Sequence, residues 1–130
     1  MSTLSTCQLI PVDIVTAALG GALIKPPQPF HDDYLGDGCQ YDAGQDRAGH
    51  ARFAYAAIAP VSSCETAKSL GPVTPIENLG DAAFAIDGED AQQLWVLMKG
   101  KGAIVVAIGD VPNPGGARQI AGYLIAALRG

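Results

Sequence analysis

The hydrophobic positions of the chain follow a helical period near its beginning. Between residues 11 and 19, Val12, Val15 and Leu19 fall on one helical face. Gly20 follows directly, and glycine is the residue best suited to a left-handed C-cap. We therefore predict a short amphipathic helix over residues 11–19.

The next segments change from an irregular pattern to a strand pattern. Residues 21–37 hold three prolines and no sustained period, which predicts a loop. Two runs rich in β-formers follow at 38–43 and 51–59, around a polar turn that contains glycine, and this arrangement predicts an antiparallel hairpin. Residues 62–70 then have the composition of a helix of one to two turns.

The second half of the chain contains the most apolar runs. Strands are predicted at 82–86, 92–99 and 102–109, and both faces of the last two are apolar. Such strands are expected at the centre of a sheet, with neighbours covering them. The chain closes with Pro114 at a first helical position and an apolar stripe behind it, which predicts a C-terminal helix.

These elements define a fold class. Their order is helix, two strands, helix, three strands, helix, and short connections between consecutive strands favour antiparallel pairing. We predict an α+β fold, a mainly antiparallel sheet of about five strands with three helices. The chain of 130 residues is the size of one domain, so residues 1–130 are expected to form a single unit.

Composition narrows the classes of partner. Hydrophobic residues make up 48% and charged residues 16%, which indicates a large core and a sparsely charged surface. The net charge is −5 and the basic residues are scattered, so we expect no nucleic-acid partner. No apolar run is long enough to span a bilayer. Membrane association is expected only through a lipid anchor, which this chain does not carry.

The three cysteines are the main candidates for chemistry. No Cys-x-x-Cys pair occurs, and zinc needs about four ligands where the chain offers two histidines. A site built from His31 and His50 with Asp32 or Asp33 is less favoured than a solvated loop, so we predict no metal and no cofactor. Cys64, in the first turn of a short helix, has two interpretations: a reactive thiol or a small buried hydrophobe.

Cys7 and Cys39 flank the proline-rich segment. A cross-link there would restrain the part of the chain with the least secondary structure of its own. Closing a loop of about 33 residues would stabilise the fold by about 3 to 4 kcal/mol, and it would require an oxidising compartment.

No catalytic signature accompanies these cysteines. The nucleophile pattern Gly-x-Ser-x-Gly is missing from the sequence, so no catalytic residue is predicted. Four aromatic residues are candidates for a ligand pocket, although aromatic residues on strands more often belong to the core: Phe53, Tyr55, Trp95 and Tyr123.

Three segments resemble a family of actinobacterial secreted lipoproteins whose domain has no assigned biochemical function. They are "CQLIPVDIVTAALG" (7–20), "DGCQY" (37–41) and "ENLGDAAF" (77–84), in the order and spacing of that family. The resemblance implies that Cys7 and Cys39 are disulfide-linked, which leaves Cys64 as a free thiol. It also implies an extracytoplasmic location, secreted or anchored to the cell envelope. Ile10, where the family usually has threonine, and the additional Cys64 depart from its pattern.

Three functional hypotheses follow. The leading one is a non-enzymatic extracytoplasmic domain that binds a small apolar ligand, an envelope component or a protein partner. The second is a thiol-dependent enzyme or redox sensor that uses Cys64. If the resemblance does not hold, the alternative location is the cytoplasm, with three free thiols. The third is a structural homodimer joined through the apolar strand pair around Trp95.

Overall fold

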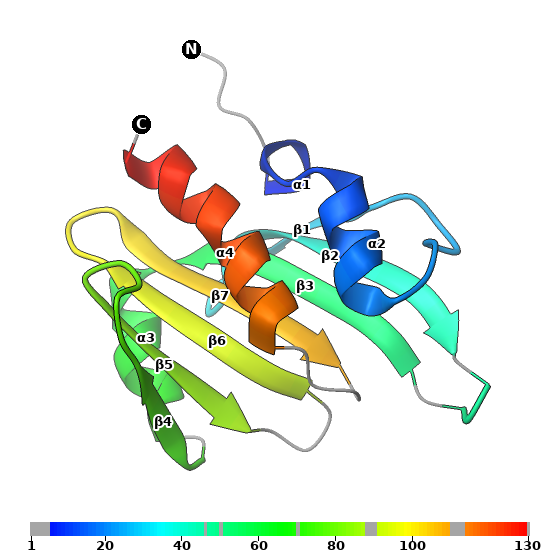
Figure 1. Cartoon of the computed structure of the whole chain (residues 1–130). Coiled ribbons are helices and arrows are strands. Elements are labelled where there is room, and N and C mark those ends of the chain that lie inside the picture. The colour runs from blue at the N-terminus through cyan, green and yellow to red at the C-terminus, as the bar shows by residue number, and fades with distance from the viewer. Residues whose placement is uncertain are drawn as a thin grey trace.

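The computed structural model describes residues 6–45, 47–49, 51–69, 71–87, 91–109 and 114–129. Within these ranges the chain forms four helices and seven strands (Figure 1). In chain order they are α1 (Thr6–Leu9), α2 (Val12–Leu19), β1 (Gln28–Asp32), β2 (Gly36–Gln45), β3 (Ala51–Ala59), α3 (Val61–Ala67), β4 (Val73–Ile76), β5 (Ala82–Asp87), β6 (Ala91–Met98), β7 (Gly102–Gly109) and α4 (Pro114–Arg129).

The strands form one antiparallel sheet in the order β1-β2-β3-β7-β6-β5-β4. After the β1-β2-β3 meander, the chain passes through α3 to the far edge at β4. It then returns strand by strand to β7, which closes the sheet by pairing with β3. The predicted α+β class with an antiparallel sheet is confirmed. The predicted numbers were wrong, because there are seven strands and four helices where five and three were expected.

The two unpredicted strands, β1 and β4, are the two edges of the sheet. Each pairs through a stretch that contains a proline, with Pro29 opposite Cys39 and Pro75 opposite Phe84. An edge strand tolerates proline because one side of its backbone has no neighbour to receive an N–H group. The prolines that break the strand pattern in the sequence therefore also protect both edges from pairing with another chain.

The unpredicted helix, α1, is separated from α2 by a proline. A residue that precedes proline is disfavoured in the α conformation, so the helical path is interrupted at Ile10. Pro11 is the N-cap of α2, and Gly20 ends that helix in the left-handed conformation with φ 75°. The Gly20 N–H donates to the Thr16 carbonyl. The helix predicted over 11–19 is thus present, one residue shorter at its start.

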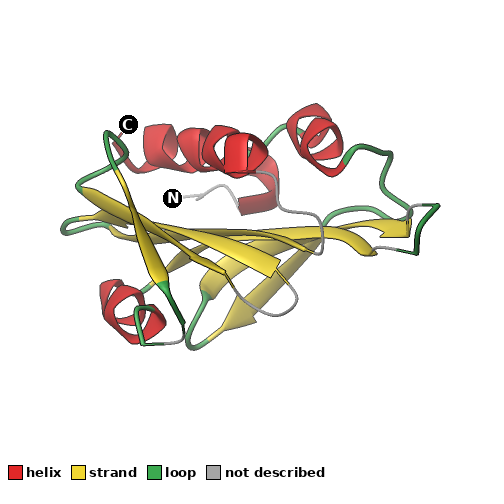
Figure 2. Ribbon diagram, turned by 60° about the horizontal axis from the view of Figure 1, so that its bottom comes forward, coloured by secondary structure: helices red, strands yellow, loops and turns green. Residues whose placement is uncertain are grey.

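Helices cover the two faces of the sheet unequally. Helices α1, α2 and α4 lie on one face, called here the helix-side face, and α3 alone lies on the other, called the open face (Figure 2). The helix-side core includes Val15 of α2, Ile120 and Leu124 of α4, and the strand residues beneath them. On the open face, α3 packs on β6 and β7 and leaves β1 and β2 without a helix.

The most buried element is β7. All of its residues are buried, and it pairs with β3 on one side and β6 on the other. Ile104 and Val106 point into the helix-side core, whereas Ala103 and Val105 pack beneath α3. The continuous apolar run of this strand therefore reflects burial on both faces, as its sequence predicts.

A disulfide joins Cys7 of α1 to Cys39 of β2, as the family resemblance implied. Cys39 is fully buried in the helix-side core, where Tyr41 lies two residues further along the same strand face. The Thr6 hydroxyl donates to the Asp37 carbonyl over 3.0 Å, so the short first helix is attached to β2 at two neighbouring points.

The first prediction concerns this cross-link. Protein made under oxidising conditions and denatured without reductant should show one free thiol by titration, with Cys7 and Cys39 linked in peptide mapping. Reduction should lower the free energy of unfolding by about 3 to 4 kcal/mol, because the unfolded chain regains the entropy of an open loop. Cys64→Ala is the matched control, since it keeps the cross-link. Three free thiols in such protein would contradict the prediction.

Arg52 of β3 connects helix α2 to an irregular part of β2. Its Nη1 donates to the Gly20 carbonyl over 3.2 Å. Its Nη2 donates to the carbonyls of Ala43 and Gln45, over 3.2 and 3.4 Å. The pairing of β2 with β3 shifts register between residues 42 and 45, and the guanidinium binds carbonyls within this irregular stretch.

The second prediction tests this clamp. Arg52→Lys should lower the free energy of unfolding by about 1 to 3 kcal/mol, because a single ammonium group cannot reach both segments at once. Denaturant unfolding measures the change. Arg47→Lys, in the exposed turn beside β3, is the matched control and should stay within about 0.5 kcal/mol of the parent. Equal losses in both variants would contradict the clamp.

Candidate functional site

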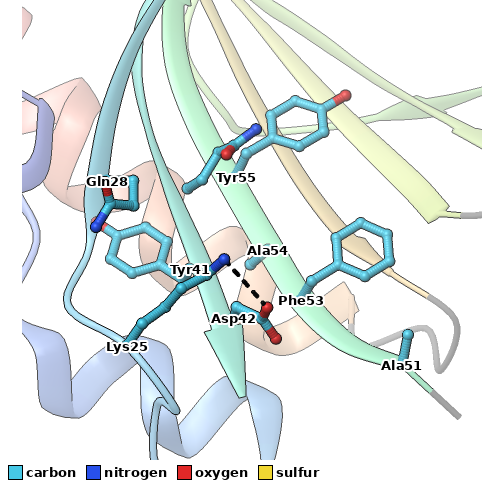
Figure 3. Close-up of a pocket in the computed structure, with 9 residues that line it drawn as sticks. Lys25, Gln28, Tyr41, Asp42, Ala51, Phe53, Ala54 and Tyr55 are labelled. Atoms are coloured by element: carbon cyan, nitrogen blue, oxygen red, sulfur yellow. Dashed lines mark ion pairs between the residues drawn. The ribbon is translucent and has the colours of Figure 1, made fainter. Parts of the chain in front are cut away.

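A pocket of about 440 Å³ lies on the part of the open face that α3 does not cover. Strands β2 and β3 form its floor, and the segment that leads into β1 forms one side (Figure 3). Its lining residues combine aromatic rings, two amides and one ion pair: Lys25, Gln28, Gln40, Tyr41, Asp42, Ala51, Phe53, Ala54 and Tyr55.

Strand register brings the lining side chains together. Gln28 pairs with Gln40, and Gln40 pairs with Tyr55, so these three side chains form one row across the open face. Asp42 pairs with Phe53 in the next row. Tyr41 and Ala54 alternate with these residues and pack in the helix-side core, so they border the pocket only at its floor.

The charged groups of the pocket are paired with each other. Lys25 Nζ lies 3.7 Å from Asp42 Oδ2, and the two side chains meet over the β2 strand (Figure 3). The Ile24 N–H donates to the Asp42 carbonyl over 2.8 Å, which fixes the incoming segment beside β2. The Gln28 amide donates to the Pro26 carbonyl over 3.1 Å. The segment that sequence analysis predicted as a loop therefore supplies one wall of the site.

Phe53 and Tyr55 lie across small residues of β7. Tyr55 is paired with Ala107, and the Phe53 ring occupies the space where a side chain at Gly109 would be. On the open face β7 carries Val105, Ala107 and Gly109 in turn, so side-chain size decreases toward the pocket. This decrease leaves room for both rings to rest on the sheet.

A chain of hydrogen bonds holds the Tyr55 ring. The indole Nε1 of Trp95 donates to Gln93 Oε1 over 2.9 Å, and Gln93 Nε2 donates to the Tyr55 hydroxyl over 3.1 Å. Indole is only a donor, so Trp95 determines which end of the Gln93 amide faces it. Burial raises the pKa of Tyr55 above its usual 10.0, with a further increase from Tyr34, so the phenol is protonated at neutral pH. The Phe30 ring packs edge-on against Tyr55, 6.3 Å between centroids.

The four aromatic residues predicted as a pocket are not all in one place. Phe53 and Tyr55 line the pocket. Trp95 is fully buried beneath α3, where its ring stacks on Phe84, and Gln93 connects it to Tyr55 in the pocket. Tyr123 lies on α4, on the helix side of the sheet, with 38% of its surface exposed.

Sequence reasoning missed the polar half of the pocket. Gln28, Gln40, Lys25 and Asp42 were not singled out, because β1 was predicted as loop and its register with β2 was therefore unknown. The available signal was the alternation of Gln40 and Asp42 with buried residues along β2.

Cys64 is a buried free thiol. Only 3% of its surface is exposed, and burial raises its pKa above the usual 9.0 even though the nearby Lys68 lowers it. A thiol in this environment is protonated at neutral pH, and it packs as a small hydrophobe in the core beneath α3.

The apolar strand pair β6–β7 lies in the interior. Trp95 and Val96 of β6 are fully buried, as is all of β7. These residues supply the core of the sheet, whereas Gln92, Gln93 and Leu97 of β6 are half-buried.

Acidic residues surround His31 at the hairpin between β1 and β2. Its Nδ1 lies 2.7 Å from Asp37 Oδ1, and its Nε2 lies 3.9 Å from Asp33 Oδ1. The Asp32 carboxylate instead accepts the N–H groups of Tyr34 and Leu35, which shapes the turn. His50, the second histidine of the metal site considered above, lies outside the described residues. Over the part of the chain that the structure describes, no cluster of three or more ligating side chains is arranged to hold a metal ion.

The third prediction concerns His31. Its hydrogen bond to Asp37, and then the Asp37 charge, raise the pKa of His31 above 6.5. A raised pKa in the folded state means that the pair stabilises the fold below the unfolded pKa of about 6.5, and that this contribution disappears as pH rises through the folded value. In an NMR titration, Asp37→Asn should bring the pKa of His31 back down. Asp33→Asn, the matched control, should have a smaller effect. Equal effects would contradict the pairing.

Comparison of the chain with protein-family models, with curated proteins and with solved structures finds no match. The resemblance to the actinobacterial lipoprotein family therefore stays a prediction from its motifs. Among the helices of the described ranges, none has the length and apolar character needed to cross a membrane.

Proposed function

We propose that this protein is a non-enzymatic extracytoplasmic binding domain, and that it binds its ligand in the pocket between Lys25, Phe53 and Tyr55. The observation that carries the proposal is the pocket itself. Two aromatic rings rest on the part of the open face that α3 leaves uncovered, beside two amides and an ion pair. A concave site with apolar walls and a few polar groups is the usual form of a small-molecule site.

The location rests on the disulfide. Disulfides persist in oxidising compartments and are rare in reducing ones. The Cys7–Cys39 link, buried at its β2 end, supports an extracytoplasmic location, as does the motif resemblance. An envelope component is accordingly the favoured ligand, with a protein partner as the alternative.

The two rival hypotheses have less support. A thiol enzyme or redox sensor at Cys64 would need an accessible thiol with a lowered pKa, whereas this thiol is buried and its pKa is raised. A homodimer through β6 and β7 would need those strands to be exposed, and they form the core.

The fourth prediction tests the pocket as a binding site. Phenol and cyclohexanol, titrated into ¹⁵N-labelled protein, should shift the amide signals of residues 40–42 and 53–55 more than those of other residues. Phe53→Ala should weaken these shifts because it removes half of the aromatic surface. Tyr123→Ala, on the helix side of the sheet, is the matched control and should leave them unchanged. Shifts spread evenly over the surface, or concentrated elsewhere, would contradict the proposal.

A further inference from the structure

We propose that the ligand of this pocket is a neutral saccharide. Its ring lies against the Phe53 and Tyr55 rings, and its hydroxyl groups form hydrogen bonds with the surrounding polar side chains. The inference rests on the proposed function, because it assigns a ligand class to the same pocket. It follows from the rigidity of the rings, the charge of the site and the number of polar groups that a ligand would cover.

The two rings form a preorganised surface. They are two residues apart on β3, about 6.7 Å along the strand, and both point to the open face. The Phe53 ring packs on Gly109, where a side chain would leave no room for it, and the Gln93 hydrogen bond holds the Tyr55 ring over Ala107. Rings fixed in this way lose little entropy on binding, and they present an apolar surface to a flat ligand. A pyranose ring is such a ligand, because the C–H groups on one of its faces form a flat apolar surface.

The electrostatics of the pocket favour a ligand without charge. Among the described residues that line it, Lys25 is the only cationic one, and its ammonium group is paired with Asp42. An anionic ligand would have to compete with that carboxylate and approach a chain of net charge −5. A cationic ligand would have to displace Lys25. A neutral ligand leaves the ion pair intact.

The polar groups exclude a purely apolar ligand. Gln28 and Gln40 are exposed beside the rings, and a ligand that fills the pocket would remove both amides and the ion pair from water. A covered polar group that finds no hydrogen-bond partner weakens binding, because its hydrogen bonds to water are lost without replacement. Sugar hydroxyls donate and accept, so they can replace the lost water at amides and carboxylate alike. A saccharide therefore meets both requirements, an apolar face and many hydroxyls.

The single tryptophan provides a readout. Trp95 is fully buried, but two hydrogen bonds connect it to the Tyr55 ring that lines the pocket. A ligand that moves or desolvates Tyr55 should change the Trp95 environment and so its fluorescence. Tyr55→Phe keeps the ring and removes the hydroxyl that accepts from Gln93. It should therefore preserve binding while reducing the fluorescence response.

The test titrates the protein with two β-linked disaccharides, cellobiose and N,N′-diacetylchitobiose, while Trp95 fluorescence and ¹⁵N amide shifts are recorded. The first probe carries only hydroxyls and the second also carries acetamido groups, so their relative affinity separates these two kinds of sugar. We expect saturable changes at residues 40–42 and 53–55. Tyr55→Ala should weaken binding about tenfold, the size expected for loss of one stacking face.

Gln40→Ala is a second variant that leaves the core untouched, because this side chain is exposed. It should weaken disaccharide binding severalfold and leave cyclohexanol binding unchanged, and Tyr123→Ala should change neither. If phenol and cyclohexanol bind in the pocket and both disaccharides do not, the saccharide inference is overturned and the binding domain stands. If no probe binds there, both proposals fail. Disaccharide binding that is insensitive to Tyr55→Ala and Gln40→Ala would also overturn the inference.

Discussion

The burial of β7 on both faces is the constraint on which the rest of this structure depends. This strand is the last in the sequence, yet it occupies the middle of the sheet, between the strands β1 to β3 and the strands β4 to β6. Neither half can bury its apolar side chains without it, because Ile104 and Val106 complete the helix-side core and Val105 completes the core beneath α3. Pairing strands so distant in sequence carries a cost in loop entropy, which the contacts on both faces of β7 must offset.

The same strand couples the core to the candidate site. Its open-face side chains decrease in size from Val105 through Ala107 to Gly109, and the aromatic residues of β3 fill the space that this decrease leaves. Trp95, on the other neighbour of β7, holds Tyr55 through Gln93. The site is therefore an extension of the packed interior, and its rings have little freedom to move. Rigid rings would favour binding at an open pocket, because few side chains would have to be ordered when a ligand binds.

The covalent and polar restraints act on the part of the chain with the least regular structure. The segment between α2 and β1 is attached to the rest by the Cys7–Cys39 disulfide before it, the Arg52 clamp at Gly20, and the Ile24 hydrogen bond to Asp42. Together these fix a proline-rich stretch that has few internal hydrogen bonds. One wall of the pocket, including Lys25, depends on them. The stability of this segment and the shape of the candidate site thus depend on the same few residues.

The sequence by itself determined the elements whose pattern is local. The helix before Gly20, the central character of β6 and β7 and the α+β class follow from periodicity and capping, whereas the pairing of Cys7 with Cys39 was implied only by the motif resemblance. The edge strands did not follow, because Pro29 and Pro75 remove the alternation by which a strand is recognised, and only a neighbouring strand makes them part of a sheet. For the same reason, only part of the candidate site could be predicted from the sequence. Phe53 and Tyr55 stand out as aromatic residues on a strand, whereas Gln28, Gln40 and Asp42 join them only through register. Register depends on which strands meet, and that is decided by packing across the whole sheet rather than by any local stretch.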